Sequence, residues 1–156
     1  MTAGVDALVA SHPLFAGLPG DVTSGIAQCA RNVAFGPGEL LLVEGRPADT
    51  LFLLRRGRVA IEIHAADRGT LVVETVDAGG AVGWSWLFPP YRWHFDARAL
   101  GPVGAVAIDA ACLRSAMEAD DALGRLLVTR VAGVLLERLQ ATRLRLLDLY
   151  GADRAG

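Results

Sequence analysis

The residues best suited to binding a small molecule are gathered in one stretch, from Gly79 to Phe95. It begins with glycines at positions 79, 80 and 83, and then holds all three tryptophans of the chain, a tyrosine, two phenylalanines, an arginine and a histidine. Glycine reaches backbone conformations with positive φ and lets another group approach the main chain closely. Tryptophan and tyrosine offer flat, mostly apolar faces with a single polar atom. These residue types predict a ligand cradle, and its aromatic content argues against a small, highly charged ligand.

A short turn, a break and a strand should position these side chains. Trp84 to Phe88 is long enough for one helical turn. Pro89-Pro90 should close that turn, because proline can neither continue a helix nor donate a ladder hydrogen bond. From Trp93 to Ala99, apolar residues at odd positions alternate with polar residues at even positions, which is the period of a strand with one buried face. The expected layout is a glycine turn, one helical turn, a proline break and a strand.

The aromatic and basic side chains of this stretch have a binding interpretation and a plainer one. Trp84, Trp86 and Trp93 could form an aromatic box around a flat or apolar ligand. Large aromatic side chains more often serve packing, here by filling a barrel or covering a dimer interface, and we favour that interpretation. Arg92 could bind an anion, although a solvated arginine in a turn is more common.

Two other side chains, His94 and Ser85, could carry chemistry of a different kind. His94 could ligate a haem iron, but the sequence offers no obvious second ligand, so an ordinary strand histidine is favoured and no cofactor is expected. Ser85 lies between two tryptophans without an accompanying histidine and acid, so it is not expected to be a nucleophile. No metal-ligand or acid–base cluster is visible, and we predict that the protein is not an enzyme.

Composition limits the class of protein. With 156 residues, 53% of them hydrophobic, the chain is long enough for one globular domain with a substantial core. A net charge of −2 gives no basic face for nucleic acid. The N-terminus lacks a basic region followed by an apolar run, and no segment approaches the ~20 apolar residues of a membrane span; we therefore predict a cytoplasmic protein that contacts no membrane. Cys29 and Cys112 lack metal-binding or CxxC spacing, and we interpret them as buried, unpaired, small apolar residues in a reducing compartment.

Three regions follow one another along a single predicted domain, residues 1–156. Residues 1–35 are typical of a short N-terminal helical segment, and residues 109–150 of C-terminal helices. Between them, residues 36–108 alternate short apolar segments with turn-forming residues. Six to eight strands at this spacing predict an antiparallel jelly-roll barrel, also called a double-stranded β-helix. The expected fold class is therefore mainly β with flanking α.

The longest predicted element is a helix from about Asp121 to Tyr150. Its apolar residues step by three or four, which gives a near-heptad seam, and further leucines widen the apolar surface beyond one stripe. Such a helix must bury two faces, one on its own barrel and one elsewhere. A symmetric partner helix is the simplest second surface. We therefore expect a homodimer whose interface includes Val128, Val131, Leu135, Leu139, Leu146 and Leu149.

Several segments carry a resemblance to a known family. Residues 36–45 read GPGELLLVEG and residues 51–59 read LFLLRRGRV. Together they resemble the cyclic-nucleotide-binding domain of the catabolite-activator (Crp/Fnr-like) family. The segment from His12 to Leu18 is similar to the N-terminal segment of that family, and the long helix after Asp120 is similar to its dimerising helix. The resemblance covers nearly the whole chain, and it implies that residues 79–95, from here on called the cassette, correspond to a phosphate-binding cassette.

The cassette departs from the ligand chemistry of that family. Where the family binds cyclic nucleotides, the cassette begins Gly-Glu, and an arginine followed by Ser or Thr and Ala pairs with the cyclic phosphate. Here Gly83 matches the glycine, but Trp84 stands where the glutamate is expected and Trp93 where the arginine is expected. Arg92 lies one residue away, and a shift of one residue along a strand reverses the facing of a side chain. Because tryptophan offers one N–H donor and no charge, the resemblance implies the fold of a cyclic-nucleotide sensor without its usual site chemistry.

Two functions follow from this resemblance, neither of them catalytic. The first is a sensor or regulatory module that does not bind cyclic AMP or cyclic GMP in the usual way and signals through its dimerising helix. Its candidate ligand-binding residues are Gly83, Trp84, Ser85, Trp86, Arg92, Trp93 and His94. The second is a degenerate domain that serves as an interaction subunit, docked on an unidentified protein partner without a small ligand. An open pocket lined by Arg92 and the tryptophans would favour the first function, and a pocket filled by its own side chains the second.

Transcription factors of the resembled family continue from the long helix into a helix-turn-helix domain. Here only residues 151–156 follow the predicted helix, which is too short for an element that reads DNA. Together with the net charge, this predicts no direct DNA binding.

Overall fold

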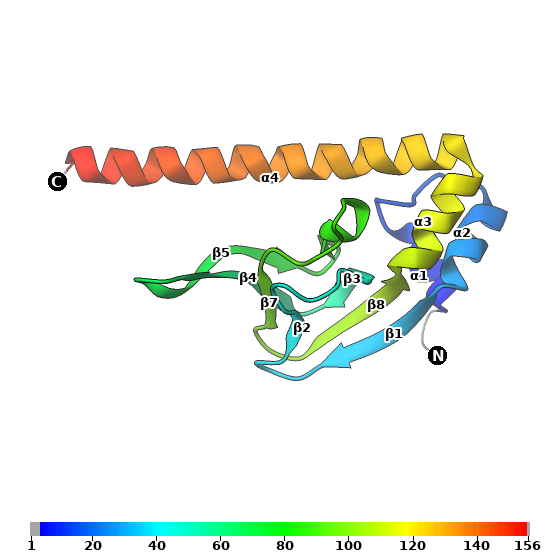
Figure 1. Cartoon of the computed structure of the whole chain (residues 1–156), viewed down its shortest axis with the longest axis horizontal. Coiled ribbons are helices and arrows are strands. Elements are labelled where there is room, and N and C mark those ends of the chain that lie inside the picture. Colours follow the sequence, from blue (N-terminus) through cyan, green and yellow to red (C-terminus); the bar gives the residue numbers. More distant parts are fainter. Residues whose placement is uncertain (1–3, 156) are drawn as a thin grey trace.

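The computed structural model describes residues 4–155, with side chains described up to residue 151, as a β domain flanked by helices. The helices are α1 (Val5–Ser11), α2 (Gly20–Ala27), α3 (Ala110–Ala119) and α4 (Asp121–Ala155). The strands are β1 (Ala30–Phe35), β2 (Leu40–Leu42), β3 (Thr50–Arg56), β4 (Arg58–Ala65), β5 (Gly69–Asp77), β6 (Ala81–Val82), β7 (Asp96–Ala99) and β8 (Val103–Asp109), with one 3-10 turn, η1 (Ser85–Leu87). Figure 1 shows α4 running the length of the molecule, above the strands and past the β4–β5 hairpin.

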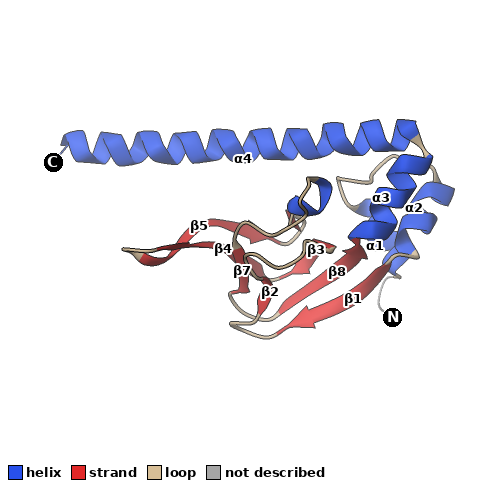
Figure 2. Ribbon diagram, viewed as in Figure 1, coloured by secondary structure: helices blue, strands red, loops and turns tan. Residues whose placement is uncertain are grey.

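The strands form two four-stranded antiparallel sheets (Figure 2). One sheet has the order β1-β8-β3-β6 and the other the order β2-β7-β4-β5. Strand β8 is buried over most of its length and pairs with both β1 and β3, so it forms the centre of the first sheet. The predicted mainly β, antiparallel jelly-roll fold with flanking helices is confirmed, and its strands form two sheets rather than one closed barrel.

The structure differs from the sequence prediction at residues 30–35. We assigned these residues to the N-terminal helical segment, whereas they form β1 and pair one by one with residues 103–108 of β8. Helix α2 already ends at Ala27. The ladder to β8 satisfies the backbone groups that a longer helix would have to pair internally.

A glycine turn and two aspartate helix caps direct the chain around the sheets. Gly57 turns β3 into β4 with φ of +87°, and a Cβ there would overlap the carbonyl oxygen of Pro102, so only glycine fits. The side chain of Asp109 caps α3 by accepting from the N–H of Cys112 at 2.9 Å. Asp120 likewise accepts from a backbone N–H in the first turn of α4.

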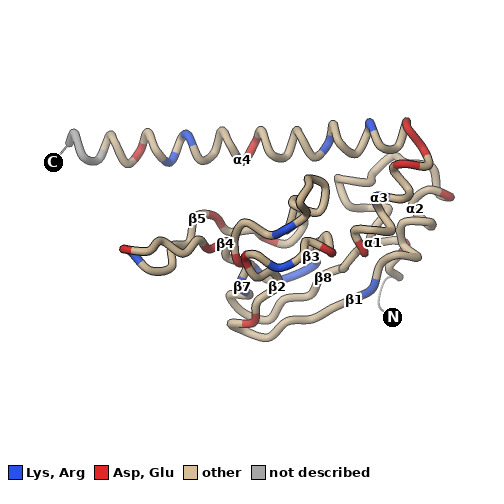
Figure 3. Tube along the Cα trace, viewed as in Figure 1, with Lys and Arg blue, Asp and Glu red and all other residues tan. Residues whose placement is uncertain are grey.

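The apolar packing of helix α4 on the domain is confined to its first half. Leu123, Leu127 and Val131 are buried in the common core, whereas every residue from Leu139 to Gly151 is exposed. Charges of both signs are spread along the helix (Figure 3). None of the helices within residues 4–155 is both long enough and apolar enough to span a membrane.

The structure contradicts the interpretation of the two cysteines. We expected buried, unpaired thiols, but Cys29 and Cys112 form a disulfide with their Cα atoms 6.0 Å apart. Cys29 is half-buried and Cys112 is exposed. The sequence could not show this pairing, because the two residues are 83 positions apart and only the fold brings their Cα atoms within bridging distance.

Candidate functional site

The glycine turn that opens the cassette is hydrogen-bonded to strand β3. The N–H of Gly79 donates to the Leu54 carbonyl at 2.8 Å, and the N–H of Leu54 donates to the Gly80 carbonyl at 2.9 Å. Gly79 and Gly83 have φ of +92° and +95°, a region that favours glycine. The predicted turn is therefore present, and β3 fixes where the cassette begins.

After this turn, the helical turn is shorter and the strand begins later than the sequence indicated. The 3-10 turn covers only Ser85–Leu87. Strand β7 begins at Asp96, not at Trp93. The backbone of Trp93 pairs instead with the loop before β3: its N–H donates to the Arg46 carbonyl at 3.0 Å, and its carbonyl accepts from the Gly45 N–H at 2.9 Å.

All three tryptophans of the cassette are buried within this one chain. The exposed fractions of Trp84, Trp86 and Trp93 are 6%, 1% and 5%. Trp93 packs directly on Gly83: two atoms of its six-membered ring lie 2.7 and 2.8 Å from the point where a Cβ on Gly83 would stand. The indole therefore covers the backbone surface that the cassette glycine leaves open to close approach.

The polar candidates of the cassette do not join this contact. Arg92 is exposed, and its Nη1 donates to the carbonyl of Gly45 at 2.8 Å. His94 is exposed and Ser85 is half-buried in the 3-10 turn. Among the described residues, no group of three His, Cys, Asp or Glu side chains is placed to hold a metal ion.

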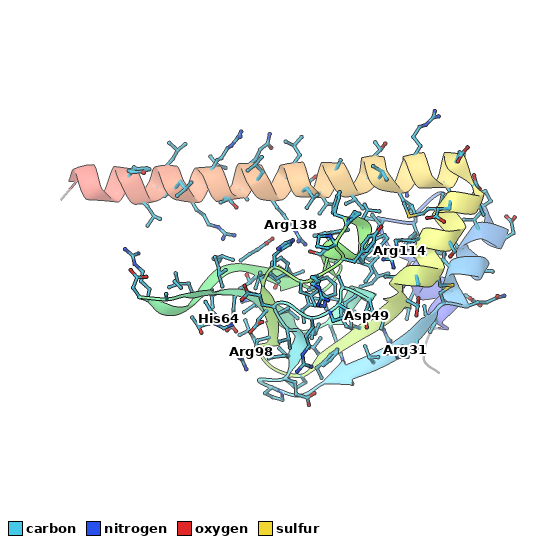
Figure 4. The ribbon with its side chains drawn as sticks, in the orientation of Figure 1. Arg31, Asp49, His64, Arg98, Arg114 and Arg138 are labelled. Carbon is cyan, nitrogen blue, oxygen red and sulfur yellow. A yellow bond between two sulfur atoms is a disulfide. The ribbon has the colours of Figure 1, made fainter. Side chains whose placement is uncertain are left out.

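Two arginines from the C-terminal helices hold the cassette, and the sequence analysis did not single them out (Figure 4). The first is Arg114 of α3. Its Nη1 donates to the carbonyl of Trp86 at 2.5 Å, and its guanidinium carbon lies 4.3 Å from the centroid of the Tyr91 ring. Helix α3 therefore contacts both ends of the segment that contains the prolines.

The second is Arg138 of α4. Its Nη2 donates to the Ala81 carbonyl at 2.7 Å, its Nε lies 3.2 Å from Glu74 Oε1, and its guanidinium carbon lies 5.5 Å from the centroid of the Trp84 ring. Burial lowers the pKa of this guanidinium from its usual value. Arg138 follows the buried Val131 by seven residues, which places it on the same face of the helix, and this spacing was the signal in the sequence.

An open groove of about 560 Å³ lies between α4, the glycine turn and the N-terminal segment. Trp84 lines it, but Trp86, Arg92 and Trp93 do not. His12 also lines the groove, and burial lowers its pKa against a weaker, opposite effect of nearby backbone carbonyls. The groove is therefore distinct from the space over Gly83, which the chain fills with its own side chain.

A second polar cluster lies on the sheet β2-β7-β4-β5, where the sequence analysis proposed no site (His64 is labelled in Figure 4). His64 Nε2 lies 2.7 Å from Asp96 Oδ2, and His64 Nδ1 lies 2.9 Å from the hydroxyl oxygen of Thr70. The other carboxylate oxygen of Asp96 accepts from the Glu44 N–H at 2.7 Å. The cluster joins the start of β7, and so the end of the cassette, to the β4–β5 hairpin.

The surroundings of this cluster shift two pKa values. The hydrogen bond to Asp96 raises the pKa of His64. Burial alone would raise the pKa of Asp96, but the hydrogen bonds from the Glu44 N–H and from His64 outweigh it, so its pKa is lowered. The pairing of His64 with Asp96 depends on the order of the strands, because β4 lies next to β7 in the sheet.

The chain is similar in sequence to proteins of a known family. The model of a family described as the cyclic nucleotide-binding domain matches residues 32–120. A CRP-like cAMP-activated global transcriptional regulator of Mycobacterium tuberculosis is 26% identical over 152 residues, which cover 97% of this chain and 66% of that protein. The chain thus spans 66% of the length of this curated relative.

Solved structures show the same fold. A Geobacter metallireducens protein, provisionally assigned as cyclic nucleotide-binding, is 32% identical, with a TM-score of 0.77 over 89% of this chain and 99% of its own. A cyclic nucleotide-binding domain from Methylobacillus flagellatus has the same TM-score of 0.77 at 20% identity, over 92% of this chain and 81% of its own. At that lower identity the likeness is one of fold.

Proposed function

Because the chain belongs to the cyclic nucleotide-binding domain family, we propose that it is a non-catalytic regulatory module that does not bind cyclic AMP or cyclic GMP in the family's usual way. We further propose that it signals through a homodimer built on α4. The observation that carries the first proposal is the packing of Trp93 on Gly83. The fold is that of this family, and the Trp93 indole covers Gly83, the glycine that the resemblance places in the phosphate-binding cassette.

The two missing hydrogen-bonding side chains set the expected loss of affinity. A cyclic phosphate is an anion, and the family's cassette offers it an arginine, while a glutamate accepts from the ribose hydroxyl. By the resemblance, Trp93 and Trp84 correspond to those two residues, and they are 5% and 6% exposed. A hydrogen bond to a charged group contributes about 1.5–3 kcal/mol, so losing two weakens binding by about two to four decades at ~1.4 kcal/mol per decade. A nucleotide would also have to displace the Trp93 ring from Gly83.

The exposed side chains of α4 support the proposed dimer. Val128, Leu139, Leu146 and Leu149 are 47%, 47%, 48% and 64% exposed, and Leu135 is half-buried. They succeed one another along one side of the helix at intervals that suit a coiled-coil seam. An apolar row of this length is more stable when a second copy of the same helix covers it.

One residue of the predicted seam needs correction. Val131 is 2% exposed and belongs to the core of its own domain, so it cannot also contact a partner. Leu123 and Leu127 share its buried face, which lies beside the seam, about a quarter-turn around the helix. Ala132, which is exposed, completes the three- and four-residue spacing between Val128 and Leu135. The proposed interface is therefore Val128, Ala132, Leu135, Leu139, Leu146 and Leu149.

Calorimetric titration with cyclic AMP and cyclic GMP tests the ligand proposal. We expect no binding in the micromolar range, with the cAMP-activated relative from Mycobacterium tuberculosis as the positive control. A low-micromolar Kd for either nucleotide would overturn the proposal. The double variant Trp84→Glu, Trp93→Arg restores the family's two residue types. If circular dichroism shows that it folds, it should bind more tightly than the native chain.

The buried tryptophans also favour the second function, that of an interaction subunit without a small ligand. A pocket filled by the chain's own side chains was expected to favour this function, and the Trp93 ring fills the space over Gly83. Native mass spectrometry of the purified protein distinguishes the two. A dimer without added mass supports the interaction subunit, whereas a retained small molecule supports a non-standard effector, for which the groove beside Trp84 offers space.

A further inference from the structure

The disulfide joins two segments at the junction between the N-terminal and C-terminal parts of the domain. Cys29 lies between α2 and β1, and Cys112 is the third residue of α3. Beside the bridge, the N–H of Asp109 donates to the Cys29 carbonyl at 2.9 Å. The bridge therefore fastens the first turn of α3 to the residue before β1, across 83 residues of sequence.

Both cysteines are placed so that the bridge can open and close. Cys112 is exposed and Cys29 is half-buried, so a thiolate from solution can reach the Cys112 sulfur, which thiol–disulfide exchange requires. Once reduced, the Cys29 thiol has an acceptor, because its Sγ lies 3.7 Å from the Gly25 carbonyl oxygen. The fold thus accommodates the reduced form without leaving this thiol unpaired.

The bridged helix is the one that holds the cassette. Arg114 follows Cys112 by two residues and contacts Trp86 and Tyr91. At its other end α3 meets the start of α4 closely: a Cβ on Gly124 would lie 3.0 Å from the Met117 carbonyl oxygen. A change in how firmly α3 is held can therefore reach both the cassette and α4.

We propose that Cys29 and Cys112 form a redox-active pair, whose disulfide locks α3 to the residue before β1 and whose reduction loosens the hold of α3 on the cassette. A small thiol attacks the Cys112 sulfur as its thiolate, which forms a mixed disulfide and releases the Cys29 thiolate. A second thiol then resolves the mixed disulfide. The net reaction yields two protein thiols and one small-molecule disulfide, and a small disulfide drives the reverse reaction. The inference goes beyond the proposed function, since it needs neither a nucleotide nor a dimer.

Alkylation of the folded protein tests the chemistry. Protein incubated with oxidised glutathione should carry no alkylatable cysteine and should give a cross-linked peptide pair containing residues 29 and 112. Brief treatment with dithiothreitol, without denaturant, should then allow iodoacetamide to label both cysteines. Alkylation without any reductant after oxidation would overturn the pairing, and a bridge that opens only in denaturant would overturn its redox activity.

Tryptophan fluorescence tests the effect on the cassette. Reduction should increase quenching by acrylamide and lower the Tm by about 5–15 °C, the range expected for losing a bridge across a long loop in a domain of this size. The double variant Cys29→Ser, Cys112→Ser should match the reduced protein and should not respond to dithiothreitol. If that variant fails to fold, Cys112→Ser, which lacks the bridge with a single change, replaces it. Equal quenching of the oxidised and reduced native protein would overturn the link to the cassette.

Discussion

Arg138 of α4 lies against Trp84 of the cassette, with its guanidinium carbon 5.5 Å from the ring centroid. The same guanidinium donates to the Ala81 carbonyl and pairs with Glu74. The Arg138 side chain therefore connects α4 with strand β5, through Glu74, and with the cassette, through Ala81 and Trp84. The side chain is 22% exposed, so solvent screens these interactions only in part.

The change Arg138→Ala should reveal this connection. We expect the free energy of unfolding to fall by about 1–3 kcal/mol, because hydrogen bonds to a charged group are lost and Glu74 is left without its partner. Tryptophan emission should also become easier to quench. Urea denaturation and acrylamide titration measure the two effects. Arg143→Ala, at an exposed position of the same helix, is the control, and an equal effect of both variants would contradict the prediction.

A second prediction, about stability, follows from the contact between Gly83 and Trp93. In Gly83→Ala, the new methyl group must occupy a point 2.7 Å from the indole, in a backbone with φ of +95°. Strain of the left-handed backbone costs about 1–2 kcal/mol, and overpacking of the core adds about 1–3 kcal/mol. We therefore expect the free energy of unfolding to fall by ~2–5 kcal/mol in denaturant titrations.

Gly79→Ala separates the two causes of that loss. Its φ of +92° is almost the same, but a Cβ at position 79 would meet nothing within 4 Å. This variant should lose only the ~1–2 kcal/mol of backbone strain. If both variants are equally destabilised, the Trp93 ring does not press on Gly83.

The sequence predicted those parts of the fold that depend on local patterns. Alternating apolar residues marked most strands, and the positive-φ glycine turn was visible at Gly79. Residues 30–35 were misassigned because their strand is defined by pairing with β8, and pairing partners are not local. Val131 was placed in the dimer seam because the three- and four-residue spacing alone does not say which of two adjacent stripes faces the core.

At the candidate site, the sequence supplied residue types but not their neighbours. The resemblance predicts that glutamate and arginine would stand at positions 84 and 93, where this sequence has tryptophans, and this alignment stays a prediction. That the Trp93 ring covers Gly83, or that Arg114 reaches the 3-10 turn from α3, depends on segments far apart in the sequence. The pairing of Cys29 with Cys112 was missed for the same reason.

The His64–Asp96 pair should make stability depend on pH. The pKa of His64 is raised above its usual 6.5, so its contribution is fully present below pH 6.5 and is lost as the pH rises through the folded-state pKa. The pKa of Asp96 is lowered from 3.8, so its contribution is present above pH 3.8 and is lost as the pH falls through the folded-state pKa. The pair should therefore stabilise the protein most between about pH 4 and 6.5.

The variant His64→Gln measures this contribution. The difference in free energy of unfolding between the native chain and this variant should be largest near pH 5.5 and should shrink as the pH rises to about 9, because the imidazolium loses its charge. His94→Gln, at an exposed position of the cassette, controls for general effects of removing a histidine. A difference for His64→Gln that stays constant from pH 5 to 9 would show that the pair does not depend on protonation.

The last prediction concerns the proposed α4 dimer. Leu139 is 47% exposed at the middle of the seam, and Leu147 is 65% exposed about a quarter-turn away from it around the helix. Burying a leucine contributes about 2 kcal/mol, and a symmetric interface counts each seam residue twice, so a carboxylate at position 139 in both subunits should separate them. Light scattering should give a dimer for the native chain and for Leu147→Glu, and a monomer for Leu139→Glu, while circular dichroism shows the β domain intact. A native chain that is monomeric at micromolar concentration, or a Leu139→Glu variant that stays dimeric, would place the signalling surface elsewhere than on this seam.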